Sequence, residues 1–283
     1  MKSTLRQALE SQLGQAIKSL RPLSGGDICQ GYALTLDDGQ NFFAKTRPGA
    51  PAGMFKAEAS GLQWLRQARA LRIPEVIAVD EQFLVLEYLA SGVKIANFDE
   101  VLGQRLAALH RAPVTTFGLD HDNFIGPLPQ VNSPRHSWVE FFVELRLRPQ
   151  LEAALKSGRG PRGWAQRFES LYKALPSFVP EEPPSRLHGD LWGGNLLVGP
   201  AGEPCLIDPA VYAGHREVDL AMMQLFGGFG GRVFEAYKSS FPLLDGHQQR
   251  VQLYQLYPLL VHVNLFGGGY AAQVERALQG LPG

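Results

Sequence analysis

The chain has 283 residues, of which 45% are hydrophobic and 19% charged, and this composition is typical of a folded globular protein. Its 27 basic and 27 acidic residues cancel, which argues against a nucleic-acid or anionic-membrane surface as a partner. The two cysteines, Cys29 and Cys205, lack metal-ligand spacing, so neither a disulfide framework nor a zinc site is indicated. No apolar run reaches membrane-spanning length and no signal-peptide pattern is seen, so we expect a cytoplasmic protein.

The first ninety residues predict a helix followed by several strands. Residues 4–19 carry apolar side chains at intervals of four, which predicts a helix. Residues 24–31 then interrupt the pattern, and Gly25 and Gly26 could form a turn between two strands that lies close to phosphate groups. Any hairpin can carry such glycines, so the turn alone does not identify a phosphate site.

The next segment predicts a charged pair. Residues 32–36 and 41–45 read as two strands of a hairpin, and the second strand ends at Lys45, the place of the phosphate-binding lysine in kinases. Residues 54–68 predict a helix with Glu58 on its apolar face. Because a buried unpaired carboxylate is costly, we expect Glu58 to pair with Lys45. An exposed lysine and a solvated glutamate are the alternatives.

Two further strands are predicted at residues 72–80 and 82–89, followed by a linker at residues 90–92. In a kinase-like lobe, Glu87 to Leu89 would form the hinge that binds adenine through main-chain groups. From residue 97 onward the pattern is mostly helical. The polar stretch 120–138 could bind a polyhydroxylated ligand or form a packed loop.

Residues 188–195 read HGDLWGGN and carry the strongest functional signal of the chain. Asp190 precedes Asn195 by five residues, as the base and a magnesium ligand do in kinase catalytic loops. A hairpin is predicted between this loop and Asp208, and it would bring Asp208 near Asn195, so that two hard oxygen ligands could bind Mg²⁺. Asp219 begins an apolar helix and could accept hydrogen bonds from the loop amides. In the alternative interpretation, Asp190 and Asn195 only stabilise turns.

These stretches resemble the fructosamine kinase (ketosamine-3-kinase) family, whose protein-kinase-like fold is related to that of aminoglycoside phosphotransferases. The most specific matches are residues 188–195, residues 208–210 and residues 214–217, and the resemblance covers nearly the whole chain. It implies an α+β, two-lobed fold, with a β-rich ATP-binding lobe at residues 1–90 and a mostly helical catalytic and substrate lobe at residues 91–283.

The resemblance further implies ATP- and Mg²⁺-dependent phosphorylation of a sugar hydroxyl on a ketosamine, a deglycation repair reaction. In this assignment Asp190 is the base, Asn195 and Asp208 hold Mg²⁺, and Trp192 lies near the sugar, with His188 also on the substrate side. The ketosamine could be a small molecule or protein-bound, and neither its sugar nor the oligomeric state follows from the sequence. In some family members the glycine-rich turn carries a cysteine that links two chains, but here Asp27 occupies that place, so redox control through Cys29 is in doubt.

Two other functions stay open at this point. A kinase of another hydroxylated amine, such as an aminoglycoside or choline, would share the same ATP-binding residues. A nucleotide-binding module without turnover is the second alternative. The joint presence of Lys45, Glu58, Asp190, Asn195 and Asp208 argues against the module, because binding alone does not need a base.

Overall fold

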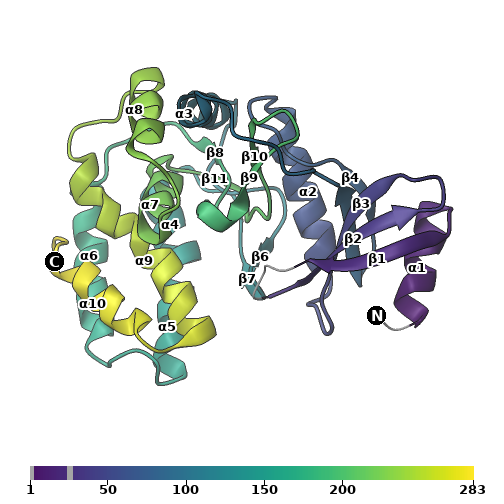
Figure 1. Cartoon of the computed structure of the whole chain (residues 1–283). Helices are drawn as coiled ribbons and strands as arrows, with labels where there is room; N and C mark the ends of the chain where they lie inside the picture. Colours follow the sequence, from purple (N-terminus) through teal and green to yellow (C-terminus); the bar gives the residue numbers. More distant parts are fainter. Residues whose placement is uncertain (1–2, 24–27) are drawn as a thin grey trace.

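The computed structural model of the chain describes residues 3–23 and 28–283, and it places a β-sheet at one end and helices at the other (Figure 1). The glycine-rich turn with Gly25 and Gly26 lies outside the described residues. The antiparallel sheet has the order β1-β2-β3-β5-β4. Its strands are β1 (Ile17–Leu23), β2 (Gln30–Leu36), β3 (Asn41–Thr46), β4 (Val76–Val79) and β5 (Phe83–Glu87). The predicted hairpin and both later strands are therefore confirmed.

One helix covers each face of the sheet (Figure 1). Side chains alternate along a strand, so Phe83 and Val85 of β5 pack with α1 (Ser3–Leu13), while Leu84 and Leu86 pack with α2 (Met54–Gln67). This alternation buries β5 on both faces. It also places α2, with Glu58, against the same face as Lys45 of β3.

The prediction of one helix over residues 4–19 is wrong in its second half. The helix ends at Leu13, and Gly14 adopts a left-handed backbone with φ of 68°. A glycine in this conformation commonly terminates a helix. Ile17 then begins β1 and is buried in the same apolar cluster as Leu9. The apolar residues recur at intervals of four because the helix and β1 both contribute to one apolar cluster, and not because one helix continues through them.

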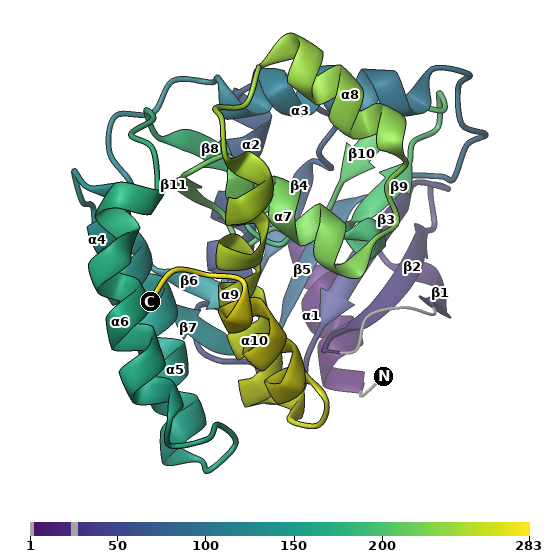
Figure 2. The ribbon, with the colours of Figure 1, turned by 90° about the vertical axis from the view of Figure 1, so that its left-hand side faces the viewer.

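The remainder of the chain is mostly helical, as predicted, and packs around the long central helix α9 (Figure 2). The helices are α3 (Phe98–His110), α4 (Trp138–Phe142), the π-helix η1 (Val143–Leu147), α5 (Arg148–Lys156), α6 (Trp164–Phe178), α7 (Glu217–Phe226), α8 (Gly231–Ser240), α9 (His247–Phe266) and α10 (Tyr270–Gln279). A short hairpin, β6 (Asn123–Ile125) and β7 (Leu128–Gln130), precedes α4. No helix in residues 3–23 and 28–283 is both long and apolar enough to cross a membrane.

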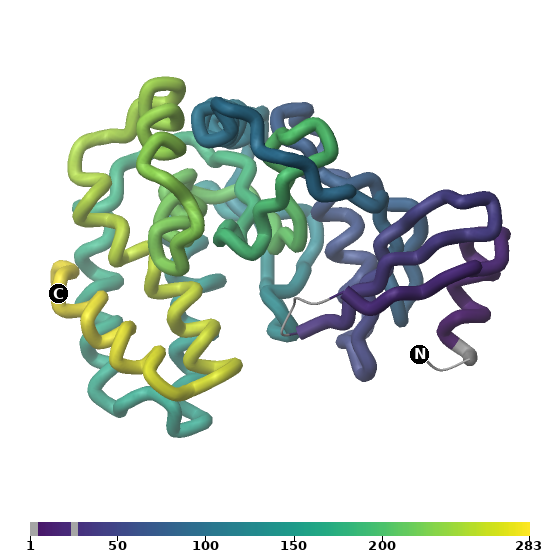
Figure 3. The backbone as a smooth tube through the Cα atoms, viewed as in Figure 1, coloured from purple at the N-terminus to yellow at the C-terminus, as the bar shows by residue number. Residues whose placement is uncertain are grey.

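The motif residues lie in loops and a turn that connect short strands, and this part of the backbone runs between the sheet and the helices (Figure 3). The pair β8 (Ser185–Leu187) and β11 (Tyr212–Gly214) flanks the loop that contains Asp190. The 3₁₀ turn η2 (Gly193–Asn195) leads into the hairpin β9 (Leu196–Val198) and β10 (Pro204–Leu206), which confirms the predicted hairpin. Asp208 follows β10 directly, so the fold brings it back toward the loop.

Several contacts join the sheet region to the helical region, and two of them are hydrogen bonds to main-chain carbonyls. The Leu206 amide donates to the carbonyl of Arg72 at 3.0 Å. The Arg186 guanidinium, which comes from β8, donates to the carbonyl of Trp64 on α2 and lies 4.3 Å from the centre of the Trp64 ring. The strand that leads into the loop with Asp190 is therefore fixed to the helix that carries Glu58.

Candidate active site

Lys45, Glu58 and Asp208 form a buried charged cluster. Lys45 Nζ lies 3.0 and 2.9 Å from the two carboxylate oxygens of Glu58, and 3.1 Å from Asp208 Oδ1. Burial lowers the pKa of Lys45, but the charges of Glu58 and Asp208 outweigh it and raise that pKa above its ordinary value. The ammonium group therefore keeps its charge, and the structure brings together three predicted residues from two regions of the chain.

The loop that precedes Asp190 is held by Asp219. The buried Asp219 carboxylate accepts hydrogen bonds from the amides of His188 and Gly189 at 2.8 and 2.9 Å, which confirms its predicted position. Gly189 has φ of 81°, and a Cβ at this position would collide with the carbonyl of Ala210. Only glycine suits this combination of backbone angle and close approach.

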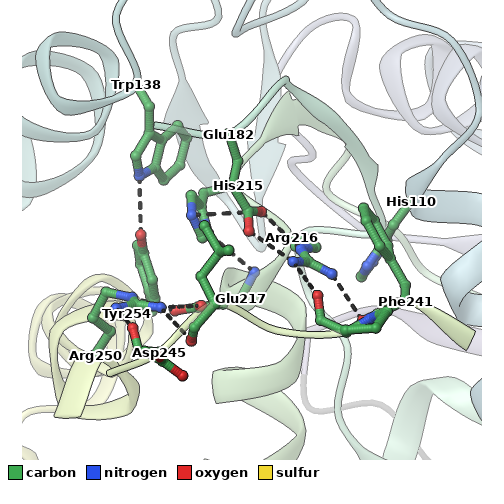
Figure 4. A network of polar contacts seen from close by, with 12 residues as sticks. His110, Trp138, Glu182, His215, Arg216, Glu217, Phe241, Asp245, Arg250 and Tyr254 are labelled. Carbon is green, nitrogen blue, oxygen red and sulfur yellow. Dashed lines mark hydrogen bonds and ion pairs between the residues drawn. The ribbon is translucent and has the colours of Figure 1, made fainter. Parts of the chain in front are cut away.

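Buried neighbours fix the Asp219 side chain in turn. His110 Nε2 lies 3.2 Å from Asp219 Oδ2, and His110 Nδ1 lies 2.7 Å from the hydroxyl of Tyr237. Since an ionised carboxylate only accepts, Nε2 carries the proton of this contact. The start of α7, on which Asp219 lies, is anchored by Arg216–Glu182 and Arg250–Glu217 pairs at 2.7 Å (Figure 4).

Asp190 and Asn195 contact each other as the motif spacing predicts. Asn195 Nδ2 donates to the Asp190 carbonyl at 2.8 Å and to Asp190 Oδ2 at 3.2 Å. Burial raises the pKa of Asp190 to about 7, with further contributions from the charges of Asp208 and Asp219. A carboxylate with this pKa can accept a proton near neutral pH, which suits a general base.

Asn195 and Asp208 together offer oxygen atoms suited to Mg²⁺. Asn195 Nδ2 also approaches the Asp208 carbonyl at 3.3 Å, so the amide nitrogen faces protein oxygens. Within the described part of the chain, Asn195 Oδ1 and Asp208 Oδ2 have no hydrogen-bonding partner. One carboxylate oxygen and one amide oxygen match the hard ligands that Mg²⁺ prefers.

A cleft of about 340 Å³, including its open mouth, lies beside Asp190. Its walls are mostly apolar. The lining residues are Ile125, Gly189, Asp190, Val218, Met222, Tyr257, Pro258, Val261 and His262. Asp190 is the one carboxylate among these lining residues.

His262 is a lining residue that the sequence did not indicate. Its Nδ1 lies 2.7 Å from the carbonyl of Pro258, and because a carbonyl only accepts, Nδ1 carries the proton. Burial lowers the pKa of His262, so the ring is neutral and Nε2 is a hydrogen-bond acceptor. A single histidine within an apolar helix carries no motif. Its position relative to Asp190 becomes visible only once α9 is packed against the loop.

Trp192 and His188 differ in their surroundings. The Trp192 ring lies over Gly194, is 39% exposed and has Phe226 at 6.5 Å in an edge-on arrangement. His188 is fully buried, and its Nε2 lies 2.9 Å from the carbonyl of Ile207. The structure therefore does not place His188 at a substrate surface, because its ring packs between the loop and the segment that carries Asp208.

At the predicted hinge, the side chain of Glu87 pairs with Arg72 and accepts from the Glu75 amide at 3.2 Å. The Glu87 amide donates to the Glu75 carbonyl at 2.8 Å. Leu89 lies just beyond β5 and, within residues 3–23 and 28–283, has no backbone hydrogen bond. Its main-chain groups are therefore available to a ligand.

The fold is that of the protein-kinase-like class. A complex of an aminoglycoside phosphotransferase with streptomycin and ATP superposes with a TM-score of 0.67 at 15% identity, covering 99% of this chain and 96% of that one, which shows the shared fold alone. A candidate fructosamine-3-kinase from Thermobifida fusca superposes with a TM-score of 0.90 at 36% identity, covering 99% of both chains.

The sequence comparison identifies the family. The model of the fructosamine kinase family matches residues 1–281. A probable ketoamine kinase from Synechocystis is 40% identical over 283 residues, which cover 98% of this chain and 95% of that protein. This chain belongs to the fructosamine kinase family and is an ATP-dependent phosphotransferase.

Replacing Asp219 tests the support of the catalytic loop. In Asp219→Asn, the side-chain NH₂ group faces N–H donors that the carboxylate accepts from in the wild type. The hydrogen bonds from the amides of His188 and Gly189 are weakened, because their acceptor loses its charge. We expect the free energy of unfolding to fall by about 3 kcal/mol in urea denaturation. Asp120→Asn is the control, because that side chain is 89% exposed and should change stability little. A loss at Asp219 no larger than at Asp120 would contradict the assignment.

Proposed function

We propose that this enzyme transfers the γ-phosphoryl group of ATP to a sugar hydroxyl of a ketosamine, the rearranged adduct of a sugar with an amine. The observation that carries the proposal is the position of Asp190, which lines the cleft and accepts a hydrogen bond from Asn195. Membership of the fructosamine kinase family and the ketoamine kinase relative support the substrate class. A phosphate ester on the third carbon would make the adduct unstable, so the proposed role is deglycation in the cytoplasm.

We assign each charged residue a role in this reaction. Lys45, oriented by Glu58, would bind the α- and β-phosphates of ATP, and Asp190 would accept the hydrogen bond of the attacking hydroxyl. Asn195 and Asp208 would hold Mg²⁺, which neutralises charge on the transferred phosphoryl group when it is bound. Catalysis then arises mainly from positioning and charge compensation rather than from covalent chemistry.

The nucleotide would bind between the two predicted lobes, residues 1–90 and 91–283. The main chain of Leu89 would contact adenine, next to Glu87, whose side chain is occupied by Arg72. Gly25 and Gly26 would approach the phosphates, although they lie outside the described residues. On the acceptor side, Trp192 would stack near the sugar, and His262 Nε2 would accept a hydrogen bond from a sugar hydroxyl or the substrate amine.

The chemistry of the cleft favours a ketosamine over an aminoglycoside. An aminoglycoside carries several ammonium groups, which need several acidic partners when they lose water. The described lining holds a single carboxylate, Asp190, with one neutral histidine and apolar side chains. A sugar with one amine fits this set better, because its hydroxyls pair with Asp190 and His262 while Trp192 covers its apolar face.

Assaying a panel of acceptors tests the proposed activity. We expect Mg²⁺- and ATP-dependent phosphorylation of ribulose-lysine or fructose-lysine, and little or none of an aminoglycoside or choline. Asp190→Asn should reduce turnover by about a hundredfold or more, since a positioned base contributes factors of this size. ATP affinity of this variant serves as the control and should be near that of the wild type. If only choline or an aminoglycoside is phosphorylated, the proposed ketosamine substrate is wrong. If the protein binds ATP but phosphorylates no acceptor, the nucleotide-binding module is favoured.

The pH dependence of the rate tests Asp190 separately. Only the ionised carboxylate can accept the hydroxyl proton, and the pKa of Asp190 is raised to about 7. We therefore expect kcat/KM to fall about tenfold for each pH unit below 7 and to level off above it. A profile that stays flat down to the ordinary carboxyl pKa of 3.8 would contradict this role.

A further inference from the structure

Three amide side chains of the polar stretch 120–138 form a buried network rather than a ligand surface. Asn123, Gln130 and Asn132 are 5%, 2% and 0% exposed. Their amide groups therefore cannot meet a ligand from solvent. Buried amides must find partners within the protein, and the partners of these amides lead to the segment that carries Asp208.

The hydrogen bonds of Gln130 have a defined direction. Its Nε2 donates to Asn123 Oδ1 at 2.7 Å and to the carbonyl of Ala210 at 3.2 Å. Its Oε1 accepts from the hydroxyl of Tyr257 at 2.7 Å. Asn123 Nδ2 in turn donates to the carbonyl of Val211 at 2.7 Å. Because carbonyl oxygens only accept, the two amides can lie in one orientation only.

A buried arginine fixes the orientation of the Asn132 amide at the far end of the network. Arg146, on the π-helix η1, is fully buried and donates to Asn132 Oδ1 at 2.6 Å. Its guanidinium lies 4.0 Å from the centre of the Tyr212 ring. No carboxylate in the described chain pairs with it, so oxygen dipoles and the aromatic face compensate its charge. Asn132 Nδ2 then points to Asn123 Oδ1 at 3.0 Å.

The other end of the network meets a strained backbone. Asp208 has φ of 53°, which is unfavourable for a residue with a side chain. Such a conformation persists only where neighbouring contacts enforce it. The catalytic loop supplies one side, because the Ala210 amide donates to the carbonyl of His188 at 2.9 Å. Gln130 and Asn123 supply the other side through the carbonyls of Ala210 and Val211.

We propose that Gln130 is a positioning residue that holds the Asp208 carboxylate in place for Mg²⁺ and ties it to the acceptor cleft through Tyr257. The inference rests on the proposed role of Asp208 as a magnesium ligand. Gln130 lies at the junction of three elements, since it contacts Asn123 of β6, the segment after Asp208 and Tyr257 of α9. Tyr257 also lines the cleft beside Asp190, so one side chain couples the metal ligand to the substrate wall.

The test measures how strongly Mg²⁺ increases the affinity for ATP, by calorimetry of the whole protein with and without the metal. Gln130→Met keeps the length of the side chain and removes its hydrogen bonds. We expect the gain in ATP affinity from Mg²⁺ to fall about tenfold, the size typical of lost support around a metal ligand. Affinity for ATP without Mg²⁺ should change much less, because Glu58 still pairs with Lys45 and the hinge is untouched.

Two further variants complete the design. Val274→Ala truncates a buried side chain of α10 outside the network, so it should lower the melting temperature and leave the Mg²⁺ gain intact. Gln130→Glu is isosteric and tests the same loss if Gln130→Met does not fold. A carboxylate can donate to neither Asn123 nor Ala210, and a protonated carboxyl group can donate to only one of them. If a folded Gln130 variant shows the same increase in ATP affinity with Mg²⁺ as the wild type, the inference is overturned.

The outcomes also separate this inference from the proposed function. A wild-type protein whose ATP affinity does not respond to Mg²⁺ would overturn the metal role of Asp208 and the inference together. A wild-type protein that gains ATP affinity with Mg²⁺ but phosphorylates no acceptor would overturn the proposed function alone. In that case the Gln130 variants would still decide the inference, because the binding measurement needs no turnover.

Discussion

The charged cluster of Lys45, Glu58 and Asp208 is the interaction on which the site depends. A lysine with 8% exposure is stable as a cation only because two carboxylates lie within 3.1 Å of it. These three residues come from β3, from α2 and from the segment after β10, so the cluster requires the sheet and the catalytic segment to be docked. The contact of Arg186 with Trp64 reinforces the same docking. The nucleotide side of the site is thus built across the junction of two regions.

In the helical region, buried polar side chains hold the loop with Asp190 and the segment with Asp208 in place. Asp219 holds the amides before Asp190 and has His110 as its neighbour, while Gln130 and Asn123 hold the carbonyls after Asp208. Each group has its own partners, so the loop and the Asp208 segment are fixed from opposite sides. Such networks cost desolvation energy, and they stabilise one geometry when their members are fully bonded. The backbone strain at Asp208 is consistent with that constraint.

The sequence predicted the residues whose chemistry depends on local spacing. Asp190 and Asn195 lie five residues apart in one loop, and the hairpin that returns Asp208 is marked by turn residues, so short-range patterns sufficed. Glu58 was predicted from its place on an apolar helix face. The places of His262 beside Asp190 and of Gln130 beside Ala210 could not be predicted, because the members of each pair lie far apart along the chain. His188 was misplaced since a motif gives residue order but not burial, and the first helix was extended past Gly14 because Ile17 continues its apolar spacing.

The central claim is that Asp190 receives the proton of a sugar hydroxyl in the cleft beside α9. A crystal structure of the protein with Mg²⁺, a non-hydrolysable ATP analogue and a ketosamine tests it most directly. We expect a sugar hydroxyl about 3 Å from an Asp190 oxygen and in line with the terminal phosphorus. A ketosamine bound with no hydroxyl near Asp190, or with another side chain in contact with the attacking oxygen, would contradict it.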